Sequence, residues 1–158
     1  MTFNPKLDLL FERKVNCPVS HLWSGWTEPE LLKKWFCPRP WKVTDCEIDL
    51  RPGGRFWNVM QGPHGERQEN LGCYLEVLPE KRLIWTGALL PDFRPAPENP
   101  HGFVFTAVVE FESLPQGGAL YRATVMHASP EGRETHEKMG FEQGWGMALD
   151  QLLELAKS

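Results

Sequence analysis

The stretch ETHEKMGFEQGWGMALDQLLELA, residues 134–156, is the part of the sequence that most strongly indicates the fold. Its apolar residues follow the three- and four-residue spacing of one helical stripe, and they are Phe141, Trp145, Leu149, Leu152, Leu153 and Ala156. The opposite side is mostly polar, with Glu142, Asp150, Gln151 and Glu154. The spacing predicts one amphipathic helix of roughly 30 Å, long enough to cross a small sheet. Two uses of the stripe stay open: it only fills a core, or it also walls a cavity.

The bulk composition is that of one ordinary globular domain, residues 1–158. Of its 158 residues, 41% are hydrophobic and 24% are charged, and a chain of this length buries a sizeable core without disulfides. The net charge of −4 argues against a nucleic-acid partner or an anionic membrane surface. No apolar run approaches the roughly 18 residues of a membrane span, and the N-terminus lacks the pattern of a secretory signal. We therefore expect a cytoplasmic protein.

The cysteines and histidines show no metal-ligand spacing. Cys17, Cys37, Cys46 and Cys73 are irregularly spaced, without a C-x-x-C motif, and are expected to be reduced packing residues. The run from His136 to Gly140 begins like a metalloprotease helix but lacks the second histidine. We expect neither a metal nor an organic cofactor. Seven tryptophans are the unusual feature, because buried tryptophan requires wide apolar surfaces.

The N-terminal third predicts one strand and two short helices. Residues 7–15 form the strand, and Pro18 suits the first turn of a helix whose apolar stripe is Val19, Leu22, Trp23 and Trp26. Thr27-Glu28-Pro29-Glu30 has the form of a capping box, so a second short helix should begin there. That helix would bury Leu31, Leu32 and Trp35.

From Lys42 to Met126 the apolar period changes to two, which predicts antiparallel strands. The ranges are 42–50, 55–61, 68–78, 82–89, 103–111 and 120–127. The turn at Arg51-Pro52-Gly53-Gly54 favours type II geometry, so the first two of these strands should form a hairpin. Residues 90–102 carry four prolines and are predicted to be a loop. That loop is either a lid or binding loop, or a surface excursion.

This order of elements predicts an α+β fold of the helix-grip kind. A curved antiparallel sheet of about seven strands would wrap around the long C-terminal helix, with two short helices after the first strand closing one end. Such an arrangement leaves a cavity wherever side chains do not fill the space between sheet and helix.

Short motifs also occur in a fixed order along nearly the whole chain, namely Arg13–Pro18, Trp26–Glu30, Asp49–Phe56, Gly62–Gly65, Gly72–Val77, Pro79–Leu83 and Gly140–Trp145. With these motifs the chain resembles the activator of heat shock protein 90 ATPase homologue-like (AHSA-type) family of the START-like (SRPBCC, Bet v 1-like) superfamily. The resemblance implies a helix-grip fold with a hydrophobic pocket between sheet and C-terminal helix. The family name also implies a stress-response role with a chaperone as partner. The eukaryotic activator has an additional N-terminal domain, whereas this sequence begins at its first predicted strand, so chaperone activation is the weaker expectation.

Seven residues are expected to line the pocket: Phe56, Asn58, Met60, Trp85, Phe105, Phe141 and Trp145. Phe56, Asn58 and Met60 share parity on one strand, so a polar Asn58 would lie among apolar walls where relatives commonly have an aromatic or aliphatic residue. If the parity of this strand is shifted, Asn58 is merely solvated. The aromatic residues also have the ordinary alternative of packing only, and Trp145 is expected to be wholly buried and mainly structural.

Catalytic motifs are scarce. Glu76 and His127 are the weak candidates for an acid or base in a cyclase or hydrolase acting on a polyketide-like substrate. Burial in an apolar pocket would raise the pKa of Glu76. Hydrophobicity instead predicts that Cys73, Leu75 and Val77 face inward, which argues against Glu76.

The leading hypothesis is therefore a protein that binds a hydrophobic or aromatic small molecule, as a monomer or homodimer. The alternatives are a co-chaperone and a cyclase or hydrolase.

Overall fold

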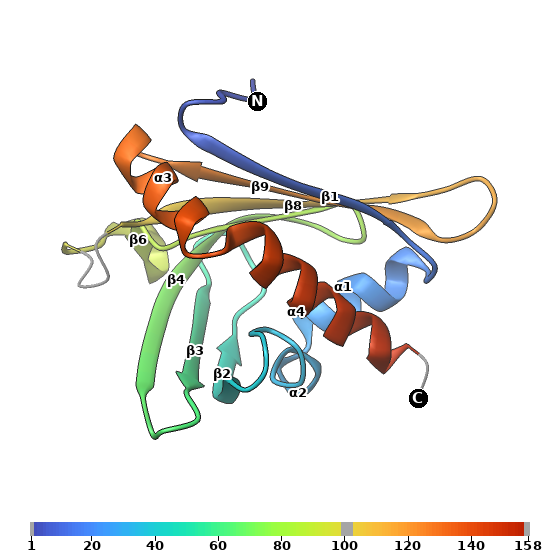
Figure 1. The fold of residues 1–158 in the computed structure, drawn as a ribbon, viewed down its shortest axis with the longest axis horizontal. Helices are drawn as coiled ribbons and strands as arrows, with labels where there is room; N and C mark the ends of the chain where they lie inside the picture. The colour runs from blue at the N-terminus through green and yellow to red at the C-terminus, as the bar shows by residue number, and fades with distance from the viewer. Residues whose placement is uncertain (1, 99–102, 157–158) are drawn as a thin grey trace.

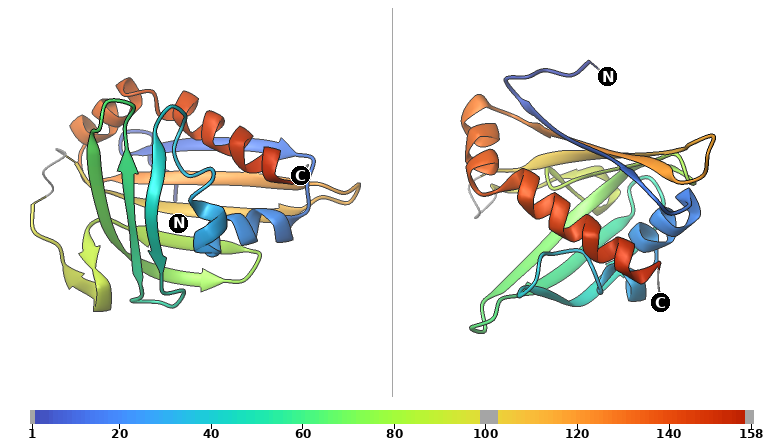
Figure 2. Two further views of the ribbon diagram at one scale, coloured as in Figure 1. Left: turned by 90° about the horizontal axis from the view of Figure 1, so that it is seen from below. Right: turned by 45° about the vertical axis from the view of Figure 1, so that its right-hand side comes forward.

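A computed structural model describes residues 2–98 and 103–156, and its main feature is a seven-stranded antiparallel sheet crossed by a helix (Figure 1). The strands are β1 (Asp8–Val15), β2 (Lys42–Ile48), β3 (Arg55–Gln61), β4 (Arg67–Leu78), β5 (Arg82–Thr86), β8 (Phe105–Ser113) and β9 (Ala119–His127). They lie in the order β1-β9-β8-β5-β4-β3-β2. The sheet bends strongly, so that β1, β8 and β9 run across β2, β3 and β4 (Figure 2). The predicted α+β helix-grip class is confirmed.

The predicted single C-terminal helix is wrong, because the structure has two helices. Helix α3 spans Pro130–Lys138 and helix α4 spans Phe141–Leu155, with the chain turning between them at Gly140. Gly140 has a φ of 92°, a left-handed conformation that interrupts the helical hydrogen-bond ladder and that glycine adopts without a steric penalty. Helix α4 alone crosses the sheet, and its 15 residues give it a length of about 22 Å.

The apolar stripe of α4 faces the sheet as predicted at its centre. Phe141, Leu149 and Leu152 are buried, whereas Leu153 is half-buried and Ala156 is exposed. The prediction that Gln151 lies on the polar side of the helix is wrong. Its side chain is buried because the chain that follows the second short helix folds against α4 and offers backbone groups to the amide.

Helix α1 (Val19–Thr27) packs against the C-terminal half of α4, where His21 Nε2 lies 3.0 Å from the carbonyl oxygen of Leu152, and helix α2 (Pro29–Leu32) packs on α1 and β2 (Figure 1). The predicted capping box does not form. The Thr27 hydroxyl donates to the carbonyl of Trp23 inside α1, and α2 begins at Pro29 without a side-chain cap. Proline is pre-organised for the first helical position, so this helix begins without the capping hydrogen bond.

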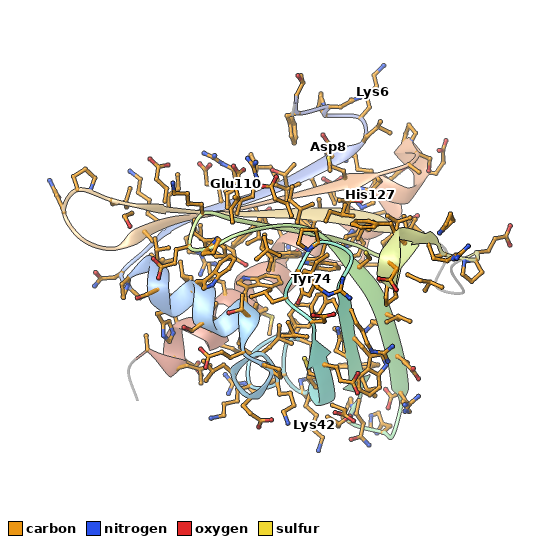
Figure 3. All side chains as sticks on the ribbon, turned by 180° about the vertical axis from the view of Figure 1, so that it is seen from behind. Lys6, Asp8, Lys42, Tyr74, Glu110 and His127 are labelled. Carbon is orange, nitrogen blue, oxygen red and sulfur yellow. The ribbon has the colours of Figure 1, made fainter. Side chains whose placement is uncertain are left out.

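Along strand β4 the alternation of inward-facing and outward-facing side chains is reversed at one point. The prediction that Cys73, Leu75 and Val77 all face inward is therefore corrected. The register with β5 shifts between Tyr74 and Glu76, as in a β-bulge. Tyr74 is therefore fully buried in the core, and Figure 3 labels it in the interior of the domain. Its ring stacks on that of Phe56, with 5.2 Å between the ring centroids. Val77 packs on the core again, whereas Leu75 does not.

The predicted loop at 90–102 contains a small structure of its own. Strands β6 (Leu89–Leu90) and β7 (Arg94–Pro95) pair around the 3₁₀ turn η1 (Pro91–Phe93). The backbone N–H of Asp92 donates to the carbonyl of Gly53, so this hairpin packs on the turn between β2 and β3. That turn joins a β-hairpin, as predicted, with Gly53 at a φ of 81°. Residues 99–102 of the predicted loop lie outside the described residues.

Candidate functional site

A cavity of about 540 Å³ lies between the sheet and helix α4. Strands β3, β4, β5 and β8 contribute one side, and α1, the chain after α2, and α4 contribute the other. The structure places all seven residues predicted to line a pocket around this one cavity: Phe56, Asn58, Met60, Trp85, Phe105, Phe141 and Trp145. Asn58 therefore faces the cavity and not the solvent.

The aromatic walls are held by edge-to-face contacts between neighbouring rings. Phe36 lies 5.6 Å from Phe56, Phe56 lies 5.1 Å from Trp85, and Trp85 lies 5.4 Å from Phe105, all as centroid distances. Such contacts stabilise each ring along the wall. Rings from the two sides also meet, since Trp26 of α1 lies 6.4 Å from Trp85 of β5, and the cavity is the space that these contacts leave.

Trp26 and Trp145 differ in burial, which corrects the expectation for Trp145. Trp145 is only partly buried and lines the cavity, whereas Trp26 is 1% exposed. The indole N–H of Trp26 donates to the hydroxyl of Tyr121 at 3.2 Å. Trp26 is therefore a structural tryptophan at this site, and Trp145 is not.

Amide side chains from β3 and β4 form a polar strip at one side of the cavity. Asn58 is 3% exposed and faces Asn70 across the strand pair. Its carbonyl oxygen accepts from the Asn70 amide at 2.9 Å, and the Asn70 carbonyl accepts from the Gln68 amide at 3.1 Å. The NH₂ group of Asn58 has no protein acceptor among the described residues.

Two histidines form a second polar feature, and only one of them lines the cavity. His127 ends β9, where Figure 3 labels it, and it is buried and lies outside the cavity lining. Its Nδ1 lies 2.9 Å from the carbonyl oxygen of Leu7. Its Nε2 lies 2.9 Å from Nδ1 of His136, whose ring lines the cavity from α3. Burial lowers the pKa of His127, and burial together with the neighbouring His127 lowers the pKa of His136 to about 4. Both imidazoles are therefore neutral near pH 7.

Neither predicted acid–base candidate lines the cavity. Glu76 is half-exposed and pairs with Arg82, and that hydrogen bond lowers the pKa of its carboxyl. A depressed pKa is the opposite of what a general acid near neutral pH requires. Within residues 2–98 and 103–156, no three His, Cys, Asp or Glu side chains come close enough together to bind a metal.

The four cysteines are buried and unpaired, and burial raises the pKa of the Cys37 and Cys46 thiols to about 11. Thiols with so high a pKa are poor nucleophiles. No helix in the described part of the chain is long and apolar enough to cross a membrane.

Sequence reasoning missed His136, Asn70 and Trp26 as parts of the site. In the sequence His136 belongs only to an incomplete metalloprotease motif, and α3 has no fully buried residue that would show an inward face. Asn70 enters the site through its register with Asn58, which depends on the length of the turn between β3 and β4.

Comparisons with known proteins agree with this architecture. Residues 16–157 match the family described as Activator of Hsp90 ATPase homolog 1-like protein. A crystal structure of a protein from Nitrosomonas europaea is 51% identical, covers 98% of this chain and 97% of its own, and has a TM-score of 0.92.

Two other solved structures are more distant. A protein from Mycobacterium smegmatis is 28% identical with a TM-score of 0.77, covering 95% of this chain and 90% of its own. One from Rhodobacter sphaeroides is 24% identical with a TM-score of 0.81, covering 99% and 97%. No curated protein matches the chain.

Proposed function

The chain belongs to the Activator of Hsp90 ATPase homolog 1-like protein family, and from this premise we propose that it binds one apolar or aromatic small molecule in the cavity between its sheet and helix α4. The main observation that supports the proposal is the presence of this cavity. Its volume of about 540 Å³ falls within the range of about 300–1,000 Å³ typical of ligand sites.

The walls support the same proposal. Protein interiors are normally close-packed, and an apolar hollow of this size forfeits contacts that a bound molecule would restore. Apolar atoms supply most of the lining surface, and the Asn58 amide and the His136 ring supply a few polar atoms that would orient the ligand. Many apolar contacts with few polar ones are the usual composition of a small-molecule site.

Substituting Gly144 with leucine is expected to block binding while preserving the fold. Gly144 lines the cavity in α4, and a Cβ placed there meets only Pro38, at 3.9 Å. The added side chain would occupy ligand space, so the affinity for naphthalene, measured by isothermal titration calorimetry, should fall at least about tenfold. Stability should rise by up to about 1 kcal/mol, because leucine is a better helix former than glycine.

Gln143→Leu is the matched control, because Gln143 is the exposed neighbour of Gly144 on the same helix. It should leave naphthalene binding unchanged. A wild-type protein that shows no saturable heat with naphthalene or with its hydroxyl, methoxy and carboxylate derivatives would remove the proposed function, as would a Gly144→Leu variant that binds as tightly as the wild type.

Chaperone activation is the second candidate, and the family description is what favours it. Activation would act through surface contacts with the chaperone rather than through the cavity. A coupled ATPase assay with the cognate chaperone should then show stimulation that Gly144→Leu leaves intact. Absence of stimulation at saturating protein would exclude this candidate without bearing on ligand binding.

A further inference from the structure

The hydrogen bonds of the two histidines fix which ring nitrogens carry protons. The Leu7 carbonyl can only accept, so Nδ1 of neutral His127 carries the proton and donates to it. Nε2 of His127 is then an acceptor, and the contact at 2.9 Å requires His136 to donate from its own Nδ1. The remaining nitrogen, Nε2 of His136, is therefore left as an acceptor.

This acceptor belongs to the cavity wall. The two nitrogens of an imidazole ring point in nearly opposite directions, so Nε2 of His136 is directed away from His127, which lies behind the wall. The His136 ring is framed by Phe103, Phe105 and Phe141 at centroid distances of 4.9, 4.9 and 5.3 Å. All three phenylalanines line the cavity, and the structure gives Nε2 no partner among the described residues.

The charges of the residues that line the cavity further restrict the chemical class of the ligand. Among the described residues, no Lys or Arg side chain lines the cavity, and the two charged residues that do are Glu69 and Glu98. Glu69 is already bonded to Trp57 and Arg67. A carboxylate, sulfate or phosphate in the cavity would therefore lose its hydration without gaining a cation, which strongly disfavours binding of an anion.

We propose that the ligand is uncharged and carries a hydroxyl or similar hydrogen-bond donor that donates to Nε2 of His136, as a phenol or an alcohol on an apolar frame would. This inference rests on the proposed function and adds the chemical class of the ligand to it. His136 is the contact residue, and His127 is a positioning residue that holds the His136 ring in the tautomer that accepts.

Three naphthalene derivatives test the proposal by calorimetry at pH 7: naphthol, its methyl ether and naphthoate. Naphthol should bind about threefold to tenfold more tightly than the methyl ether, the factor that one net hydrogen bond provides. Naphthoate should bind at least about a hundredfold more weakly than naphthol, because its charge has no counter-ion.

The variant His136→Phe keeps an aromatic ring in the wall and removes the acceptor. It should bind naphthol and the methyl ether equally well. His127→Phe should likewise abolish the preference for naphthol, because His136 is then free to carry its proton on Nε2. The comparison of naphthol with its methyl ether uses the wild-type protein alone. It therefore tests whether the cavity favours a hydrogen-bond donor even if a substituted protein fails to fold.

The two levels of the proposal fail in different ways. Equal wild-type affinity for naphthol and its methyl ether, or tight binding of naphthoate, would overturn the inference about His136 while leaving a binding cavity in place. A wild-type protein that binds none of the three, and no naphthalene, would overturn the proposed function itself.

Discussion

Replacing Trp26 with alanine is expected to lower the free energy of unfolding by about 3–5 kcal/mol, the usual cost of truncating a fully buried tryptophan. Trp26 joins several parts of the fold at one point. Its ring lies 5.0 Å from Trp35, 6.4 Å from Trp85 and 6.2 Å from Trp145, which belong to the chain after α2, to β5 and to α4. The substitution also removes the donor to the buried hydroxyl of Tyr121, which leaves that oxygen without its partner.

Urea denaturation followed by circular dichroism measures this loss without relying on tryptophan fluorescence. The midpoint of thermal unfolding should fall by roughly 6–20 °C for a domain of this length. Trp57→Ala is the matched control, because Trp57 sits outside the core cluster, with its indole bonded to Glu69. It should cost about 1 kcal/mol or less. Equal losses for the two variants would contradict the structural role given to Trp26.

The periodic part of this fold is readable from sequence. Alternation along β8 and β9 identifies the inward residues, and Ala107, Val109 and Phe111 are all buried in the core as their spacing predicts. Short turns between successive strands then favour antiparallel neighbours, which is the observed pairing. Period and turn chemistry act locally, so one sequence is enough to show them.

Single-residue departures from that period are not readable in the same way. Gly140 breaks the C-terminal helix, yet an isolated glycine inside a helical pattern is often tolerated. The register shift between Tyr74 and Glu76 moves an entire inward set by one position, and no residue type in that stretch signals it. In both places the tertiary packing, rather than the local pattern, selects the conformation.

In the candidate site, too, local periodicity predicts some residues, whereas others depend on tertiary packing. Residues on one strand could be placed together by parity, as Phe56, Asn58 and Met60 were. Their partners come from other elements: Asn70 through strand register and His136 through the position of α3. Polar atoms in the wall depend on such long-range contacts, so the polarity of the cavity was harder to predict than its aromatic character.

Gln151→Leu is the second substitution with a large expected effect, a loss of about 3 kcal/mol in the free energy of unfolding. The Gln151 amide nitrogen donates to the carbonyls of Trp35 at 3.1 Å and Cys37 at 2.9 Å, and its carbonyl oxygen accepts from the backbone N–H of Arg39 at 3.0 Å. Leucine fills a similar volume but leaves these three backbone groups without their partner. Each buried group so orphaned costs about 1–3 kcal/mol, and the exposed position of Arg39 reduces its share.

Gln143→Leu separates this effect from the general cost of an apolar residue on α4, because Gln143 is exposed and should change stability by less than about 0.5 kcal/mol. The Gln151 variant carries a second readout, since Cys37 and Pro38 line the cavity and are held in place by these bonds. Its affinity for naphthalene should therefore fall along with its stability. A Gln151→Leu protein with wild-type stability would show that the chain after α2 is held by its apolar contacts alone, whereas lost stability with unchanged affinity would show that Gln151 supports the fold but not the cavity.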